Sequence, residues 1–262
     1  MAQIRTRAAA LAAALSFVLA ACSDGGAPQA VQGSEQPTQK LGLMTSLPLY
    51  WPLGAEFGAI ASGQAEAPWQ REVLERDHEL VLLDTLTPIP GLTAEAAETD
   101  PLEGLERIAI IQPRGLSPAD NVALDNWVRE GGQLLLLLDP QLTGEYEVPL
   151  GDPRRPNDTA IIPPVLPRWG LAGAFNVEQT ELLYEEVAGG RIPVLLGSEL
   201  RVVVNEGEMN GCRTSNNLLI IQCDSVGAGT VTYLGDAALF EHEELAGEDG
   251  EAIHALLSFA YR

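Results

Sequence analysis

The chain has 262 residues, of which 15 are lysine or arginine and 37 are aspartate or glutamate, so its formal net charge is −22. A surface this acidic repels nucleic acid and anionic lipid headgroups, which excludes a nucleic-acid-binding function. The acidic residues are scattered rather than gathered in blocks, as is typical of a charged surface that maintains solubility.

The chain begins with the pattern of a bacterial lipoprotein signal. Arg5 and Arg7 precede an apolar run that is shorter than the ~20 residues a membrane-spanning helix needs. The run ends in a Leu-Ala-Ala-Cys sequence at Cys22, which resembles the lipobox whose cysteine is lipidated and becomes the mature N-terminus. We therefore predict a lipoprotein signal peptide at residues 1–21 and a membrane anchor on Cys22.

The mature protein is predicted to lie at the periplasmic face of a bacterial membrane. Residues 22–40 are too polar to bury a core, so we expect a flexible tether, followed by a single domain at residues 41–262. Ser23, rather than aspartate, follows the cysteine, which favours the outer membrane by the sorting pattern of enteric bacteria. The inner membrane stays open as the alternative.

Strands and helices alternate through the first part of the domain. Residues 41–44 and 79–83 are predicted strands, with a helix at residues 69–76 between them. The apolar run at residues 107–112 predicts a further strand. Ser117 is suited to cap the next helix and Pro118 to occupy its first position.

The predicted helix after Ser117 carries an apolar face and stops at two glycines. We expect that face to consist of Leu116, Val122, Leu124, Trp127 and Val128, and we expect Gly131 and Gly132 to end the helix. The five leucines at residues 134–138 follow without alternation, as expected for a strand covered on both faces.

The second half combines short strands with a closing strand and helix. Residues 191–196, 200–204 and 218–222 predict an antiparallel β insert, and residues 230–236 and 251–260 predict a strand and a helix. The whole pattern predicts an α/β fold with an open, mostly parallel sheet, helices on both faces and the β insert. Cys212 and Cys223, an even pair in an exported protein, predict a disulfide that pins the insert.

Several of these segments together resemble a known family. The helix to Trp127, the glycine pair before the leucine strand, Trp169-Gly170 and the closing stretch at residues 229–240 resemble the domain of GldG-like, gliding-motility-associated auxiliary subunits of ABC transporters. The resemblance covers residues 41–262. It implies a fold similar to class I glutamine amidotransferases and flavodoxins, used without catalysis as an extracytoplasmic partner of a transporter. The chain differs from the longer members in carrying a lipobox and no evident C-terminal transmembrane helix.

The sequence offers no motif for catalysis, a metal or a cofactor. No Gly-x-Ser-x-Gly occurs, and Asp139 rather than a serine or cysteine follows the leucine strand. The run from Glu241 to Glu244 surrounds His242 but lacks the His-Glu-x-x-His spacing. We therefore expect a non-enzymatic protein without metal or cofactor.

Four residues are candidate contacts for a ligand or partner. Asp139 and Asp236 both follow predicted strands, at the edge where α/β folds bind ligands, although each has a simpler reading as a turn cap. Arg154 and Arg155 lie in a proline-rich loop, where they either clamp an acidic group or pair with the loop's own aspartates.

The sequence thus favours a lipid-anchored auxiliary or binding subunit associated with an ABC-type transport system. The alternative is a periplasmic hydrolase that uses carboxylates at the carboxyl edge of the sheet. A pocket in which two carboxylates and a histidine converge would favour the hydrolase, whereas a cleft lined by apolar side chains would favour the binding subunit. Solute capture by two closing lobes is a third reading, disfavoured by the single-domain length.

Overall fold

The computed structural model describes residues 39–93, 96–175, 182–203 and 211–262. The predicted signal peptide, Cys22 and most of the predicted tether lie outside these residues. The stretch from Pro37 to Arg262 belongs to one structural unit. Within the described ranges, every helix is too short or too polar to span a membrane.

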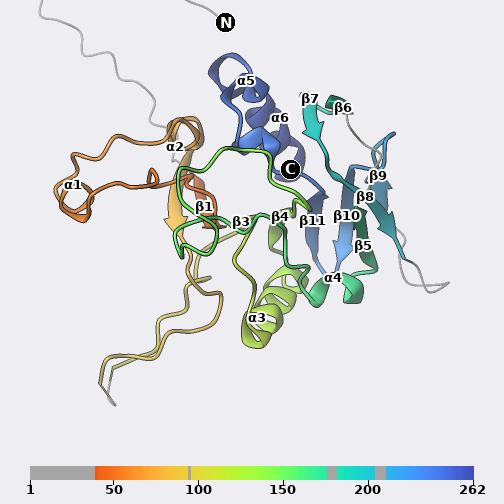
Figure 1. Cartoon of the computed structure of the whole chain (residues 1–262). Coiled ribbons are helices and arrows are strands. Elements are labelled where there is room, and N and C mark those ends of the chain that lie inside the picture. The colour runs from red at the N-terminus through yellow and green to blue at the C-terminus, as the bar shows by residue number, and fades with distance from the viewer. Residues whose placement is uncertain (1–38, 94–95, 176–181, 204–210) are drawn as a thin grey trace, which may run out of the picture. The chain divides into compact units, whose positions relative to one another are not determined.

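A seven-stranded sheet lies at the centre of this unit, in the order β2-β1-β3-β4-β11-β10-β9 (Figure 1). The first five strands in that order are parallel, and the last two are antiparallel to their neighbours. The prediction of an α/β fold with a mostly parallel sheet is confirmed. The parallel strands are β1 (Gln39–Thr45), β2 (His78–Leu82), β3 (Arg107–Ile111), β4 (Gln133–Leu137) and β11 (Gly229–Leu234).

The order of the parallel strands reverses at β1. Along the chain β1 is followed by β2 on one side of it and then by β3 on the other side. In open α/β sheets, ligands bind outside the carboxyl ends of the strands at such a reversal. The loops after β1, β2 and β3 are therefore the first place to look for a site.

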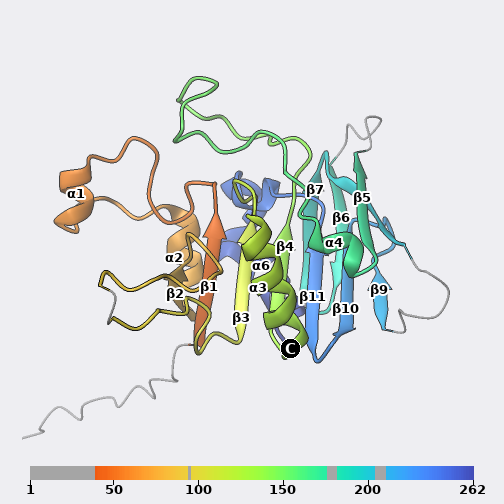
Figure 2. The same ribbon diagram turned by 90° about the horizontal axis from the view of Figure 1, so that it is seen from below.

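Alternating side chains of the central strands pack on opposite faces of the sheet. Ile108 and Ile110 of β3 face one apolar core, which contains α3 (Pro118–Arg129) and α4 (Val165–Arg168). Ala109 and Ile111 face the other core. The second core contains α2 (Trp69–Glu75) and α6 (Glu251–Ala260), which lie on the opposite side of the sheet from α3 and α4 (Figure 1 and Figure 2). The leucine strand is thus covered on both faces, as predicted.

The predicted start of α3 is confirmed in detail. The Ser117 hydroxyl accepts a hydrogen bond from the Asp120 backbone N–H at 3.0 Å, and the Asp120 carboxylate accepts one from the Ser117 N–H at 3.1 Å. This reciprocal capping satisfies two backbone donors that no helical carbonyl reaches. Asp120 also accepts from the Leu86 N–H at 2.7 Å, so the cap fixes the loop after β2 to the helix.

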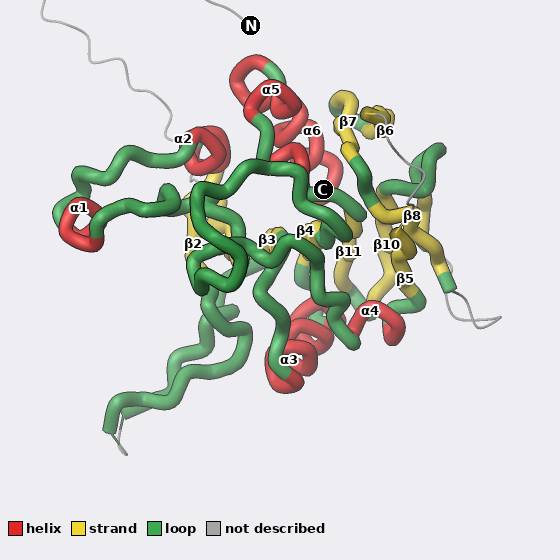
Figure 3. The backbone as a smooth tube through the Cα atoms, viewed as in Figure 1, coloured by secondary structure: helices red, strands yellow, loops and turns green. Residues whose placement is uncertain are grey.

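Long loops replace regular helices in two of the crossovers. The segment between β2 and β3 and the one between β4 and α4 are drawn almost entirely as loop in Figure 3. The former still buries Leu86, Leu102 and Leu105 against the sheet. The remaining short helices are α1 (Phe57–Ala61), η1 (Ala238–Phe240), α5 (Glu243–Ala246) and η2 (Glu248–Gly250).

The predicted antiparallel insert consists of two separate strand pairs. One pair joins β5 (Leu171–Phe175) to β8 (Ser198–Val202), and the other joins β6 (Leu182–Val187) to β7 (Gly190–Leu195). The expected strand at residues 218–222 is instead part of β10 (Ile220–Val226) in the central sheet. Ile220 and Ile221 are buried there, on a strand that lies between β11 and β9.

The disulfide between Cys212 and Cys223 is present, but its predicted place was wrong. It links β9 (Cys212–Thr214) to β10, at the antiparallel edge of the central sheet, rather than fastening the two small strand pairs. A second correction concerns α3. Val122 was expected on its apolar face, yet 61% of Val122 is exposed because the helix turns this position away from the sheet.

Candidate functional site

The carboxyl edge of the sheet brings Asp139 and Asp236 together. Each residue follows its strand, β4 or β11, by two positions, and these strands are parallel neighbours. The two carboxyl groups lie close enough for each to influence the pKa of the other. Both residues are buried, with exposed fractions of 0% for Asp139 and 1% for Asp236. The two residues selected from sequence therefore form one buried carboxyl pair.

Backbone N–H groups surround this pair. The Asp139 carboxylate accepts hydrogen bonds from the N–H of Gln141 at 2.7 Å and of Ala237 at 2.9 Å. The Asp236 carboxylate accepts from the N–H of Leu195 at 2.7 Å and of Ala238 at 2.9 Å. The pair thus fastens the ends of β4, β7 and β11 to one another.

Burial controls the protonation of the two carboxyls. It raises the pKa of Asp139 to about 6, although hydrogen bonds from Asp236, Ala237 and Gln141 act in the opposite direction. It raises the pKa of Asp236 well above its ordinary value, and the negative charge of Asp139 adds to that effect. Two neighbouring carboxylates cannot both ionise cheaply, so the pair releases its protons at higher pH than isolated aspartates do.

Gln112, which the sequence analysis missed, connects the pair to the reversal point of the sheet. Its side-chain oxygen accepts from the Asp139 N–H at 2.8 Å, and its Nε2 donates to the carbonyl of Asn157 at 2.9 Å. The residue is fully buried, and its backbone has a φ of +44°. This left-handed conformation is strained for any residue other than glycine. A glutamine directly after an apolar run of strand length was the available sequence signal.

The segment at residues 140–159, here called the edge loop, lies across the carboxyl edge. Its two ends are joined where the Ala160 N–H donates to the Asp139 carbonyl at 2.8 Å. Asn157 enters the reversal point, where its backbone N–H donates to the Ser46 hydroxyl at 3.4 Å and its Nδ2 donates to the Pro113 carbonyl at 3.3 Å. The crevice between β1 and β3 is therefore covered by the chain itself.

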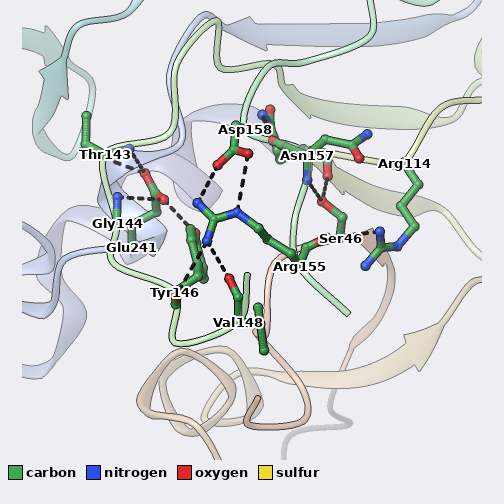
Figure 4. A network of polar contacts seen from close by, with 11 residues as sticks. Ser46, Arg114, Thr143, Gly144, Tyr146, Val148, Arg155, Asn157, Asp158 and Glu241 are labelled. Carbon is green, nitrogen blue, oxygen red and sulfur yellow. Dashed lines mark hydrogen bonds and ion pairs between the residues drawn. The ribbon is translucent and has the colours of Figure 1, made fainter. Parts of the chain in front are cut away.

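Glu241 holds the other side of the edge loop (Figure 4). Its carboxylate accepts from the N–H of Thr143 at 3.0 Å and of Gly144 at 2.9 Å, and from the Tyr146 hydroxyl at 2.5 Å. Burial, with the negative charge of Glu241 second, raises the pKa of Tyr146, so its phenol remains a donor. Glu241 is thus an anchor for the loop.

Arg154 and Arg155 have different partners in the structure. Arg155 donates to both carboxylate oxygens of Asp158 and to the carbonyls of Tyr146 and Val148, all within the edge loop (Figure 4). Arg154 is bidentate on Asp152 but lies at the rim of a cavity. Arg155 is committed to the loop, whereas the exposed Arg154 retains access to that cavity.

A cavity of about 360 Å³ lies at the carboxyl ends of β1 and β2. Its walls are mainly apolar and aromatic, with Pro48, Tyr50, Trp51 and Ile60 among them, and Asp84 and Arg154 supply charge. The Arg71 guanidinium lies 3.9 Å from the centre of the Tyr50 ring and 5.3 Å from that of Trp51, which holds both rings in place. The volume lies in the range of small-molecule sites, and the Asp139–Asp236 pair does not line it.

Thr143 and His242 form a contact that sequence reasoning did not anticipate. The Thr143 hydroxyl lies 2.8 Å from His242 Nε2, and either group can donate. On the other side of the ring, Nδ1 lies 3.7 Å from Glu244 Oε1, beyond hydrogen-bonding distance. A hydroxyl against an imidazole is the first half of a nucleophile–base–acid arrangement, but the ring donates no hydrogen bond to Glu244 that would orient it.

The remaining predictions about the site concern Cys22 and metals. Cys22, the predicted lipidation site, lies outside the described residues. Among the residues that the structure describes, no group of three or more histidine, cysteine, aspartate or glutamate side chains is placed to hold a metal ion.

Comparison with known proteins yields structural likenesses at low identity. No family model matches the chain, and no curated protein matches it. An exo-beta-1,4-mannosidase from Opitutaceae bacterium strain TAV5 is 16% identical with a TM-score of 0.48, covering 85% of this chain and 36% of the mannosidase. The E323A catalytic mutant of Gan42B, a GH42 beta-galactosidase from G. stearothermophilus, is 12% identical with a TM-score of 0.40, covering 76% of this chain and 27% of that enzyme.

A smaller protein matches over most of its own length. A ThuA-like protein from Parabacteroides merdae is 8% identical with a TM-score of 0.37, covering 87% of this chain and 92% of that one. The chain spans only about a third of the mannosidase and about a quarter of the galactosidase. At these scores the likenesses assign no activity to this chain.

Proposed function

We propose that this chain is a lipid-anchored, non-catalytic binding subunit at the periplasmic face of a bacterial membrane, and that it works with an ABC-type transport system. The cavity at the ends of β1 and β2 is its ligand or partner site. The lipoprotein signal and the Cys212–Cys223 disulfide support the location, since disulfides persist in oxidising compartments. The resemblance to GldG-like auxiliary domains supports the transport partner.

One observation carries the non-catalytic part of the proposal. The two carboxylates at the carboxyl edge are buried and bonded to four backbone N–H groups, while the cavity at the ends of β1 and β2 is lined mainly by apolar and aromatic side chains. Such walls suit binding by burial of apolar surface, with Arg154 and Asp84 orienting the bound group.

The topology supports the finer description of the fold. The five parallel strands follow the order 2-1-3-4-5, which is that of flavodoxin-like sheets, with helices on both faces. We therefore propose a fold of the flavodoxin-like or class I glutamine amidotransferase-like kind, extended by β9, β10 and the two antiparallel pairs.

The transport role is tested by affinity purification of the lipidated full chain from detergent-solubilised membranes of its host after in-cell cross-linking. We expect an ATPase and a permease to be enriched over a mock bait, and to be lost with the non-lipidated Cys22→Ala variant. Enrichment of neither component with the lipidated chain would contradict the transport role.

A hydrolase remains the second candidate because of the contact between Thr143 and His242. If His242 acted as a base, it would activate the Thr143 hydroxyl, and the raised pKa of Asp139 would provide an acid close to neutral pH. Against this, Asp139 is closed to solvent and the histidine ring lacks an orienting hydrogen bond.

The two candidates differ in a direct assay with the full chain and panels of nitrophenyl esters and glycosides. The binding proposal predicts turnover equal to buffer for the wild type and for Thr143→Val. Turnover by the wild type that falls about a hundredfold in both Thr143→Val and His242→Gln would instead establish the hydrolase.

A further inference from the structure

A second cavity lies at the opposite, amino-terminal edge of the sheet. It measures about 190 Å³ and is bounded by the first residues of β1, β2 and β3 and by the last turns of α6. Its polar lining consists of Gln39, Asp77, His78, Arg107, His254 and Tyr261, with Ser258 beside them. A water molecule occupies ~30 Å³ in the liquid, so the cavity has room for a group the size of phosphate.

Two buried side chains of this cavity have polar atoms without partners. Only 9% of His78 and 8% of Tyr261 is exposed. His78 Nδ1 and Tyr261 Oη have no hydrogen-bond partner among the described residues. A buried polar atom without a partner is costly, and most such atoms in native proteins are satisfied by protein, water or a ligand.

Arg107 is the cationic member of the cavity. Its guanidinium lies over the Tyr261 ring, 5.7 Å from the centre, and forms no ion pair within the described part of the chain. Most other arginines in this acidic protein do pair with a carboxylate, namely Arg71, Arg76, Arg129, Arg154, Arg155, Arg168, Arg201 and Arg213. No carboxylate of the described residues therefore occupies the guanidinium donors of Arg107.

We propose that this amino-edge cavity binds a small phosphate-type oxyanion, with Arg107, Tyr261 and His78 as its ligands. The guanidinium fork donates two parallel hydrogen bonds to oxyanion oxygens, which is the geometry that favours arginine in phosphate sites. The Tyr261 hydroxyl and His78 Nδ1 then gain the partners that they otherwise lack.

The local charges allow an anion here despite the acidic surface. Asp77 is the carboxylate of the lining, and its Oδ2 lies 3.1 Å from His254 Nδ1. Asp77 is also mostly exposed, where solvent screens it, whereas His78 and Tyr261 are not. The site is independent of the proposed function because it lies at the other end of the strands.

The test is equilibrium dialysis of the full chain in non-ionic detergent with radiolabelled inorganic phosphate or glycerol phosphate, at constant ionic strength set by chloride. We expect saturable binding of at least one probe, weakened about tenfold or more in Arg107→Gln because a charge-assisted interaction is lost. Binding of inorganic phosphate points to a free anion, and binding of glycerol phosphate alone points to a phosphate ester.

Two variants make the result specific. Arg191→Gln makes the same charge change on β7, where Arg191 lies over the Tyr184 ring, and should leave binding unchanged. Tyr261→Phe removes only the unpartnered hydroxyl, so it should fold normally and still bind less tightly. Absence of saturable binding by both probes, or equal binding by the wild type and Tyr261→Phe, would overturn the proposal.

Discussion

Asp139 and Asp236 make the stability of the fold depend on pH. The pKa of Asp139 is raised to about 6 by burial, and that of Asp236 is raised well above its ordinary value for the same reason. In the unfolded chain both ionise near ~4. The folded protein therefore keeps protons that the unfolded chain releases, so the stabilisation is complete below the unfolded pKa and is lost as pH rises through the folded values.

We expect the free energy of unfolding to fall by about 1.4 kcal/mol per pH unit for each proton that the folded pair retains, in urea titrations between about pH 5 and pH 8. Burial lowers the pKa of His78, which acts in the opposite direction in this window. The pH dependence of the free energy of unfolding must therefore be compared between the wild type and Asp236→Asn, which has no carboxyl proton to release at this position.

Asp236→Asn should be less stable at low pH, because an amide has a single oxygen for the two N–H groups of Leu195 and Ala238. Its stability should nevertheless decline less steeply with pH than that of the wild type. Equal slopes for the two proteins would mean that the pair holds no proton and that its pKa values are not raised.

At the scale of elements, α3 and β4 meet at a close contact between Trp127 and Gly132. The Trp127 Nε1–H donates to the Leu105 carbonyl at 3.0 Å, which fixes the ring. A Cβ on Gly132 would lie 2.5 Å from Trp127 Cδ2. This distance is shorter than a van der Waals contact, so the whole indole ring would have to move. The glycine pair thus ends the helix and also makes room for the ring.

Gly132→Ala should lower the free energy of unfolding by about 1–3 kcal/mol, because the ring must move and its hydrogen bond is strained. Urea unfolding monitored by tryptophan fluorescence measures the change. Gly58→Ala in α1 is the control, since no atom lies within 4 Å of the added Cβ and the helix interior favours alanine. A Gly132→Ala protein as stable as the wild type would show that the ring is free to shift.

The disulfide stabilises the antiparallel edge of the central sheet. It joins residues 11 positions apart and closes β9 onto β10. Reduction should cost ~3 kcal/mol, because the unfolded chain regains the entropy of the open loop. The measurement is urea unfolding of the wild type with and without reductant, with thiol content determined by mass spectrometry. Identical urea midpoints for the oxidised protein and for the reduced protein with both thiols free would contradict this stabilisation.

At the scale of the whole molecule, charge repulsion opposes folding. The formal net charge is −22, and like charges come closer together in the folded chain than in the unfolded one. Most of the ion pairs involve an exposed partner and contribute little, so screening them removes little stability.

Raising NaCl from about 0.01 M to about 0.3 M should therefore raise the thermal midpoint at neutral pH, because the Debye length shortens from ~30 Å to below 10 Å. Near the isoelectric point of about 4.3, the same salt step should have little effect. A lower midpoint at neutral pH would mean that the ion pairs outweigh the repulsion. Calorimetry of the full chain in a non-ionic detergent distinguishes these results.

Short-range patterns in the sequence determined the elements and their burial. Ser117, Pro118 and Asp120 specify the start of α3 through local hydrogen bonds, and the five leucines at residues 134–138 specify a strand covered on both faces. The apolar face of the helix is specified less strictly, since a single position such as Val122 can face solvent while the neighbouring turns pack against the sheet.

Tertiary structure decided which of these residues meet. Asp139 and Asp236 were each visible at the end of a strand, but their raised pKa values depend on β4 and β11 being neighbours, which local periodicity does not specify. The contact of Thr143 with His242 and the cavity containing His78, Arg107 and Tyr261 likewise join segments far apart in the chain. Strand order depends on the packing of the whole domain, whereas caps and hydrophobic periodicity depend on a few adjacent residues.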